Sequence, residues 1–152
     1  MKSSIFGFLA AALVLAVAIA QPSAAAADKD VEAVKKVVEE AYVKGIHVNR
    51  DVEAARKGFH PMFVMFSLRN GEVAQMTIDE WTANMEKGKK ERPDQAMPKT
   101  THEFTMVDVA GDAAVARIEI FKNDKHVFTD YLSLYRCPDG WKIVGKVFHR
   151  HP

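Results

Sequence analysis

One carboxylate in this sequence stands where it could do chemistry. In the strand-like run 127–136, Asp130 falls on the same face as the apolar residues Phe128, Leu132 and Leu134. Apolar surroundings raise the pKa of a carboxyl group toward neutrality and make the group a usable proton acceptor. Asp130 is therefore a candidate catalytic base. The alternative is a buried carboxylate that is hydrogen-bonded to a neighbouring Tyr, Trp or backbone group.

His149 is the second candidate for proton transfer. In the run 141–151 it alternates with the cationic residues Lys142, Lys146 and Arg150. Because a cationic strand face is expected to face water, we predict that His149 points inward, toward the same cavity as Asp130. The alternative is a histidine whose ring nitrogens are already hydrogen-bonded, or one that lies at the rim of the cavity. A single β-bulge would exchange the two faces of any of these strands.

His60 lies where a charged, Ala-rich stretch gives way to a run of Phe, Val and Met, directly before Pro61. The residue before a proline avoids helical angles, so a short helix is expected to end here. The imidazole of His60 would then either hang over the mouth of a pocket or cap the last carbonyl groups of that helix.

Two aromatic side chains on the predicted helices complete the candidate pocket. Tyr42 and Trp81 would join His60, Asp130 and His149 as a few convergent polar groups in an apolar cavity, an arrangement typical of small-molecule sites. Both aromatic residues also fit a plain hydrophobic core, and that interpretation stays open.

Metal and cofactor signals are weak in this sequence. His149 and His151 share a strand face, but a third ligand would have to come from His60 or His102, so we predict no metal site. The sequence contains no Gly-rich phosphate loop, paired-cysteine motif or Gly-x-Ser-x-Gly elbow. We therefore expect no cofactor.

The elements that must position these residues can be read from the apolar periodicity. Residues 28–45 have the spacing of a helix with one buried stripe, Asp51 can cap a short second helix, and residues 77–91 predict a third. A hairpin with Asn-Gly at its turn spans 62–77, and four strand-like runs follow residue 101. The predicted fold class is α+β, with three N-terminal helices packed on a strongly bent antiparallel sheet.

Residues 1–27 are predicted to be a signal peptide, and 28–152 a single domain. Lys2 precedes an apolar run from Ile5 to Ala20, shorter than the roughly 20 residues of a spanning helix. We therefore expect a periplasmic or extracellular protein that does not associate with the membrane after cleavage of the signal peptide. The 21 basic and 20 acidic side chains nearly balance, which argues against a nucleic-acid partner. Cys137 is the single cysteine, so no internal disulfide can form.

Three stretches carry a family resemblance: YVKGIHVNRDVEAARKGFHPMF, the NGE turn with the Trp-bearing helix after it, and DYLSLYRCPDGWKIVGKVFH. The whole predicted domain resembles the nuclear transport factor 2-like superfamily, and within it the bacterial putative lumazine-binding group. This resemblance implies a cone-shaped α+β fold with an apolar pocket between helices and sheet, often in a homodimer formed through the sheet. The superfamily includes isomerases, dehydratases, cyclases and proteins with no reaction, so the fold alone implies no activity.

Three functions are compatible with these observations. The leading hypothesis is an exported pocket protein that binds a small apolar or aromatic ligand. The alternative is an acid-base enzyme of isomerase or dehydratase type, in which Asp130 or His149 moves a proton and Tyr42 or His60 holds the oxyanion. The third is a homodimeric interaction module.

Overall fold

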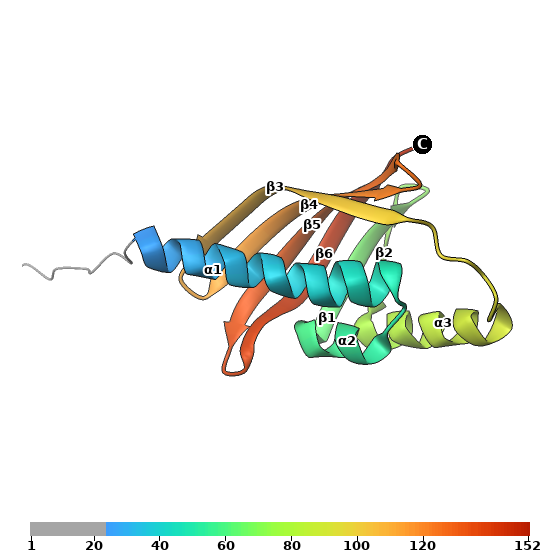
Figure 1. Cartoon of the computed structure of the whole chain (residues 1–152), viewed down its shortest axis with the longest axis horizontal. Coiled ribbons are helices and arrows are strands. Elements are labelled where there is room, and N and C mark those ends of the chain that lie inside the picture. The colour runs from blue at the N-terminus through green and yellow to red at the C-terminus, as the bar shows by residue number, and fades with distance from the viewer. Residues whose placement is uncertain (1–23) are drawn as a thin grey trace, which may run out of the picture.

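The computed structural model describes residues 24–152 (Figure 1). Most of the predicted signal peptide, residues 1–23, lies outside the described residues. The elements are, in chain order, helix α1 (Ala24–Val37), π-helix η1 (Val38–Val48), α2 (Val52–Gly58), β1 (Phe59–Arg69), β2 (Glu72–Thr77), α3 (Ile78–Glu91), β3 (Thr100–Ala110), β4 (Ala113–Lys122), β5 (Lys125–Cys137) and β6 (Gly140–Arg150). In the part of the chain that is described, no helix combines the length and the apolar character that a membrane crossing requires.

The fold is α+β, with one mixed, open six-stranded sheet in the order β2-β1-β6-β5-β4-β3. The expected antiparallel sheet is therefore only partly right, because β1 and β6 pair in parallel while all other neighbours are antiparallel. Short hairpins join only strands that follow one another, and β1 reaches β6 across the rest of the chain. The expectation of three N-terminal helices also needs correction, since α3 lies between β2 and β3.

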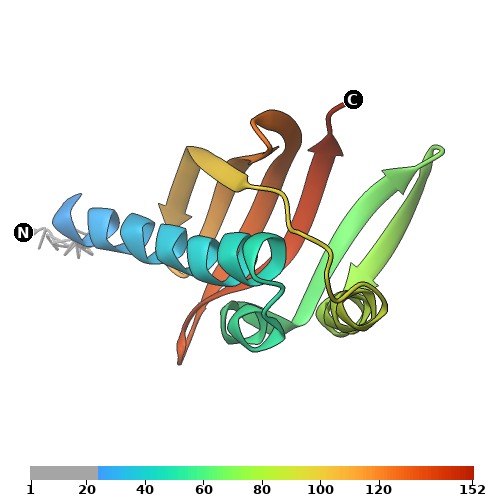
Figure 2. The same ribbon diagram turned by 45° about the vertical axis from the view of Figure 1, so that its right-hand side comes forward.

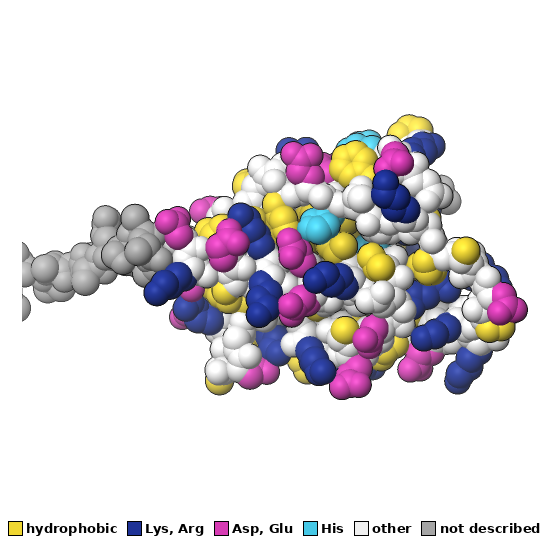
Figure 3. All heavy atoms as spheres, in the orientation of Figure 1, with side chains coloured by type: hydrophobic (Ala, Val, Ile, Leu, Met, Phe, Trp, Pro, Cys, Tyr) yellow, Lys and Arg dark blue, Asp and Glu magenta, His cyan; other side chains and the backbone are white. Residues whose placement is uncertain are grey.

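The helices lie on one face of the sheet, as Figures 1 and 2 both show. The hydrophobic core fills the space between these two layers, and its largest fully buried side chains include Tyr42, Phe63, Ile118, Leu132 and Ile143. On the helix side of the surface, acidic and basic side chains are interspersed (Figure 3), in keeping with the balanced composition. The polar clusters described below lie between the two layers or on the opposite, outer face of the sheet.

Local chemistry fixes the helix ends. Asp51 caps α2, its Oδ1 accepting from the Ala54 amide at 3.0 Å. Thr77 and Glu80 form a capping box at the start of α3, as each side chain accepts from the other residue's amide. At the end of α2, Gly58 is required by close packing, because a Cβ there would lie 2.3 Å from the Cβ of Ala41.

The first helix does not end at Gly45 as the sequence predicts. It continues as η1 to Val48, and Gly45 lies against α2, where an added Cβ would come within 3.0 Å of the Ala55 nitrogen. The glycine here allows close helix packing rather than termination. π-Helical turns are rare and frequently occur at functional sites. In this chain η1 turns Tyr42, Ile46 and His47 into the interior.

A register shift on β6 decides which side chains face the helices. Leu134 pairs with Ile143, but the next residue back along β5, Ser133, pairs with Gly145. Val144 is therefore the extra residue of a β-bulge, and the alternation of faces is inverted beyond it. As a result Lys146, not Val147, lies on the inner face.

Candidate functional site

A buried Tyr-Asp-Lys cluster joins the first helix to the centre of the sheet. Tyr42 and Asp130 have no exposed surface, and Lys146 is 5% exposed. The Tyr42 hydroxyl donates to Asp130 Oδ2 at 2.5 Å and accepts from Lys146 Nζ at 2.6 Å. Lys146 Nζ also lies 2.9 Å from Asp130 Oδ1. The three side chains therefore form a closed triangle of interactions.

Burial and charge act on this cluster together. Burial lowers the pKa of the Lys146 ammonium, and the Asp130 carboxylate opposes that shift. The pKa of Tyr42 is raised well above its usual value by burial and then by Asp130, so its hydroxyl stays protonated. Asp130 Oδ2 accepts from Tyr42 and Oδ1 lies beside the Lys146 ammonium, so both oxygens are directed at groups of the cluster. An ammonium has three N–H donors, and within residues 24–152 the polar contacts of Lys146 Nζ are those to Tyr42 and Asp130.

The ammonium of Lys146 borders a cavity of about 300 Å³ between the helices and the sheet. Four aromatic rings surround Nζ with centroids 4.6–5.7 Å away: Tyr42, Trp81, Phe128 and Phe148. Trp81, Phe128 and Phe148 also line the cavity, together with the flexible side chains of Met65, Met85 and Met97. These walls suit a flat apolar group.

Cations dominate the polar lining of this cavity. Besides Lys146 these are Arg50, Arg69, Lys122 and Arg150, and among the described lining residues none is Asp or Glu. Burial lowers the pKa of Lys122, and repulsion from Arg150 and Arg50 lowers it further. Arg50 has a left-handed backbone with φ of 49°, which is uncommon for a residue other than glycine. Although Lys146 is paired with Asp130, the other four cations give the lining of the cavity a net positive charge.

His47, on η1, lines the same cavity and carries an unsatisfied polar atom. It is 7% exposed, and its Nε2 is buried without a hydrogen-bond partner within residues 24–152. Burial, and then repulsion from Lys146 and Lys122, holds the pKa of His47 well below its usual value. A buried polar group without a partner is destabilising, so a ligand that bonds to Nε2 would remove a penalty.

The structure brings only some of the predicted site residues together. Tyr42, Trp81 and Asp130 lie at or directly behind the cavity. His60 lies in β1, outside the cavity lining, where its Nδ1 accepts from the Met62 amide at 3.0 Å. His149 is exposed on the outer face of the sheet, with its ring 4.7 Å from that of His151. Asp130 and His149 therefore do not face a common cavity.

Sequence reasoning missed Lys146, because it assigned the cationic face of the last strand to water. The bulge at Val144 reverses that assignment. Gly145 was the available signal, since an isolated glycine within a strand often marks a bulge. A larger hollow of about 740 Å³ lies between the start of α2 and the end of α3, but its lining lacks buried polar groups.

Comparison with known proteins supports the fold. A family model described as "Putative lumazine-binding" matches residues 29–149. An NTF2-like protein of unknown function from Silicibacter pomeroyi is 22% identical, with a TM-score of 0.67 over 82% of this chain and 98% of its own. A second from Shewanella baltica is 20% identical, with a TM-score of 0.68 over 82% and 96%. At these identities the likeness shows the fold alone. A comparison with curated proteins found no match.

Proposed function

This chain belongs to the putative lumazine-binding family of the nuclear transport factor 2-like superfamily, and we propose that it binds a small aromatic molecule with an anionic group. The carrying observation is the roughly 300 Å³ cavity with aromatic and Met walls and five cationic side chains in its lining. Its volume is at the lower end of ordinary ligand pockets, which suits a mono- or bicyclic compound.

The anion would lie near Lys146 and Lys122. Burial, and then repulsion from Arg150 and Arg50, lowers the pKa of Lys122, so a negative charge beside these cations would favour the charged ammonium. The third N–H of Lys146 and the unpartnered Nε2 of His47 supply directed hydrogen bonds. The flat body of the ligand would pack against Trp81 and Phe148.

Acid-base catalysis by Asp130 and His149 is the less favoured alternative. Both oxygens of Asp130 are engaged by Tyr42 and Lys146, and His149 lies on the other face of the sheet. Binding requires neither residue to be free, so the geometry supports binding better than proton transfer.

Isothermal titration calorimetry of the purified protein with matched compounds tests the proposal. The probes are 1-naphthoate, its neutral isostere 1-naphthamide, and lumazine, which the family description suggests. We expect the carboxylate to bind more tightly than the amide, and added salt to reduce the difference. Lys122→Met should remove most of the preference, whereas Lys90→Met, on the exposed side of α3, should not. If no probe binds, the binding proposal fails; if acid and amide bind equally, the anionic part fails.

We further propose that two copies associate through the outer face of the sheet. Exposed apolar side chains gather there around a hollow of about 350 Å³: Phe66, Met106, Val115, Tyr131 and Val147. Exposed apolar patches often mark interfaces, and a two-fold axis would place this patch against the same patch of a second copy. Sedimentation equilibrium should show a dimer that Tyr131→Lys dissociates, and a wild-type protein that stays monomeric at high concentration would contradict it.

We also propose that the protein is exported, because residues 1–27 have the sequence pattern of a signal peptide. Fractionation of cells that express the full chain, followed by mass spectrometry of its N-terminus, tests this proposal. Recovery of the uncleaved chain in the cytoplasm would contradict it.

A further inference from the structure

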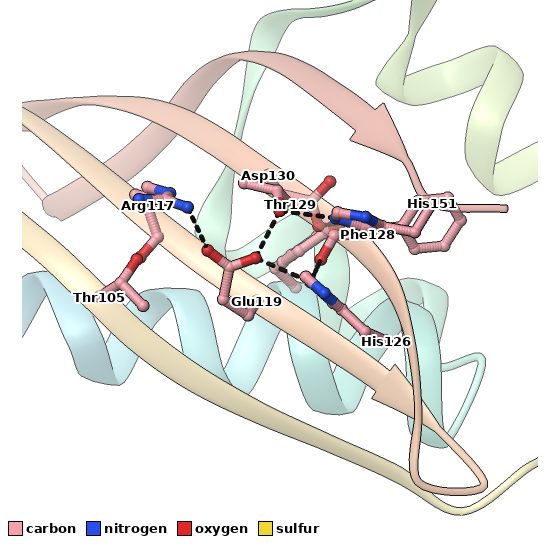
Figure 4. Close-up of polar contacts among 9 residues, drawn as sticks. Thr105, Arg117, Glu119, His126, Phe128, Thr129, Asp130 and His151 are labelled. Carbon is pink, nitrogen blue, oxygen red and sulfur yellow. Dashed lines mark hydrogen bonds and ion pairs between the residues drawn. The ribbon is translucent and has the colours of Figure 1, made fainter.

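A second group of ligating side chains lies on the outer face of the sheet, away from the cavity. Glu119 comes from β4, His126 from the start of β5, and His151 follows β6 (Figure 4). Their ligand atoms all lie within 4.8 Å of one another. Thr129, which is paired with both Glu119 and His149 across the sheet, lies among them. The proposed anion site uses none of these residues.

The contacts centre on Glu119 Oε2 and the neighbouring Thr129 hydroxyl. Glu119 Oε2 lies 2.8 Å from His126 Nε2 and accepts from the Thr129 hydroxyl at 2.5 Å. The same hydroxyl lies 2.9 Å from His151 Nε2. The rings of His126 and His151 face each other with centroids 3.7 Å apart. Two imidazole nitrogens from different strands are thus directed at the same small volume beside Glu119.

Arg117 separates the roles of the two Glu119 oxygens. Its Nη2 lies 2.9 Å from Oε1, which leaves Oε2 to the histidine side (Figure 4). Glu119 is only 6% exposed, although it lies on the outer face. A contact of this kind holds a carboxylate in one orientation, as the outer-shell partners of metal ligands do.

A purely structural network explains only part of this arrangement. Thr129 and His126 already bond to Oε2 of the buried Glu119 carboxylate, and Arg117 lies beside Oε1 as an ion-pair partner. His151 makes no bond to Glu119, yet its Nε2 is turned to the same point and its ring packs against His126. The second imidazole is therefore superfluous for neutralising the carboxylate, but it completes a set of three ligands.

We propose that Glu119, His126 and His151 bind a divalent transition-metal ion of the zinc type. Two imidazole nitrogens and one carboxylate oxygen form a ligand set that zinc uses with its fourth position open to water or a small ligand. The half-exposed imidazole of His151 would rotate away from His126 to open the space for the ion. The nearby charge of Arg117 opposes a cation, so we expect micromolar rather than tighter affinity.

The test uses the full chain purified with a tag that contains no histidine. Calorimetric titration with zinc chloride at pH 7.5 should give one ion per chain. Substitution of cobalt should give the visible absorption of a four-coordinate site. His126→Gln and His151→Gln should each weaken zinc binding by roughly tenfold or more. His60→Gln, on β1, should leave it unchanged.

Both substituted histidines are partly exposed, so the variants are expected to fold, and circular dichroism checks that they do. The proposal is overturned if wild-type protein shows no saturable zinc binding, or if folded His126→Gln and His151→Gln variants bind zinc as wild type does. A stoichiometry of one ion per two chains would also overturn it, because the three ligands would then not act within one chain.

Discussion

Breaking the pair between Lys146 and Asp130 on one side should destabilise the protein far more than removing the whole pair. With Nζ and Oδ1 2.9 Å apart and an effective dielectric constant near 20, the two charges attract by roughly 6 kcal/mol. Most of that attraction offsets the desolvation of two buried charges, so the intact pair contributes little net stability. Lys146→Met leaves an uncompensated buried carboxylate and should lower the free energy of unfolding by about 3–5 kcal/mol.

Asp130→Asn should cost a similar amount, because it strands the ammonium beside the Tyr42 hydroxyl. The double variant removes both charges and keeps an acceptor for Tyr42, so it should be more stable than the sum of the two losses predicts. We expect a coupling free energy of at least about 2 kcal/mol from this double-mutant cycle. Urea denaturation followed by tryptophan fluorescence measures each free energy of unfolding.

The exposed pair of Lys99 and Asp124, 3.2 Å apart, provides the control. Lys99→Met should change stability by less than about 1 kcal/mol, as is usual for surface ion pairs. The reasoning about the buried Tyr-Asp-Lys cluster is refuted if Lys146→Met changes stability as little as Lys99→Met does. It is also refuted if the effects of Lys146→Met and Asp130→Asn on the free energy of unfolding are additive.

Three further perturbations test other parts of the structure. Gly58→Ala should lower the free energy of unfolding by about 1–3 kcal/mol because its Cβ would overlap η1. The control, Gly88→Ala on α3, has room for a Cβ and should be neutral or stabilising. Equal effects of the two substitutions in chemical denaturation would contradict the close packing of Gly58 against Ala41. Thr77→Ala removes the side-chain acceptor of the capping box and should lower the free energy of unfolding by about 1 kcal/mol, which lowers the melting temperature. An unchanged melting temperature would argue against the cap. The pKa of His47 is lowered in the folded state, so acidification below about pH 6.5 protonates this histidine in the unfolded chain first and should reduce the free energy of unfolding by up to about 1.4 kcal/mol per pH unit. His47→Gln should flatten this pH dependence. If wild type and variant lose stability with the same slope against pH, His47 is not the group responsible.

Alternation along single strands predicted a substantial part of the interior. The inner face of β4, with Ala114, Ala116, Ile118 and Ile120, is buried as the period-two pattern indicates. The same pattern placed Asp130 with the apolar face of β5, and it is fully buried there. These strands succeed because one apolar face and one polar face leave a single register that buries the correct side chains.

The remainder depended on contacts between distant segments. Lys146 was assigned to water because Gly145 was not interpreted as the mark of a bulge, and only the pairing of β6 with β5 shows the register shift at Val144. His126 was not considered as a ligand, because only the pairing of β4, β5 and the end of β6 brings it beside Glu119 and His151. The extension of the first helix past Gly45 depends on packing against α2, which local propensity cannot report.

The parallel contact between β1 and β6 has a consequence for the speed of folding. Tyr42 and Lys146, which β6 brings together, are 104 residues apart in sequence. Contacts of such high contact order form late, because the entropy lost in closing long loops precedes the stabilisation gained. Until β6 takes its place, the β1–β2 hairpin has no partner in the rest of the sheet. We therefore predict that substitutions that weaken β6 slow folding more than equal losses of stability in α3.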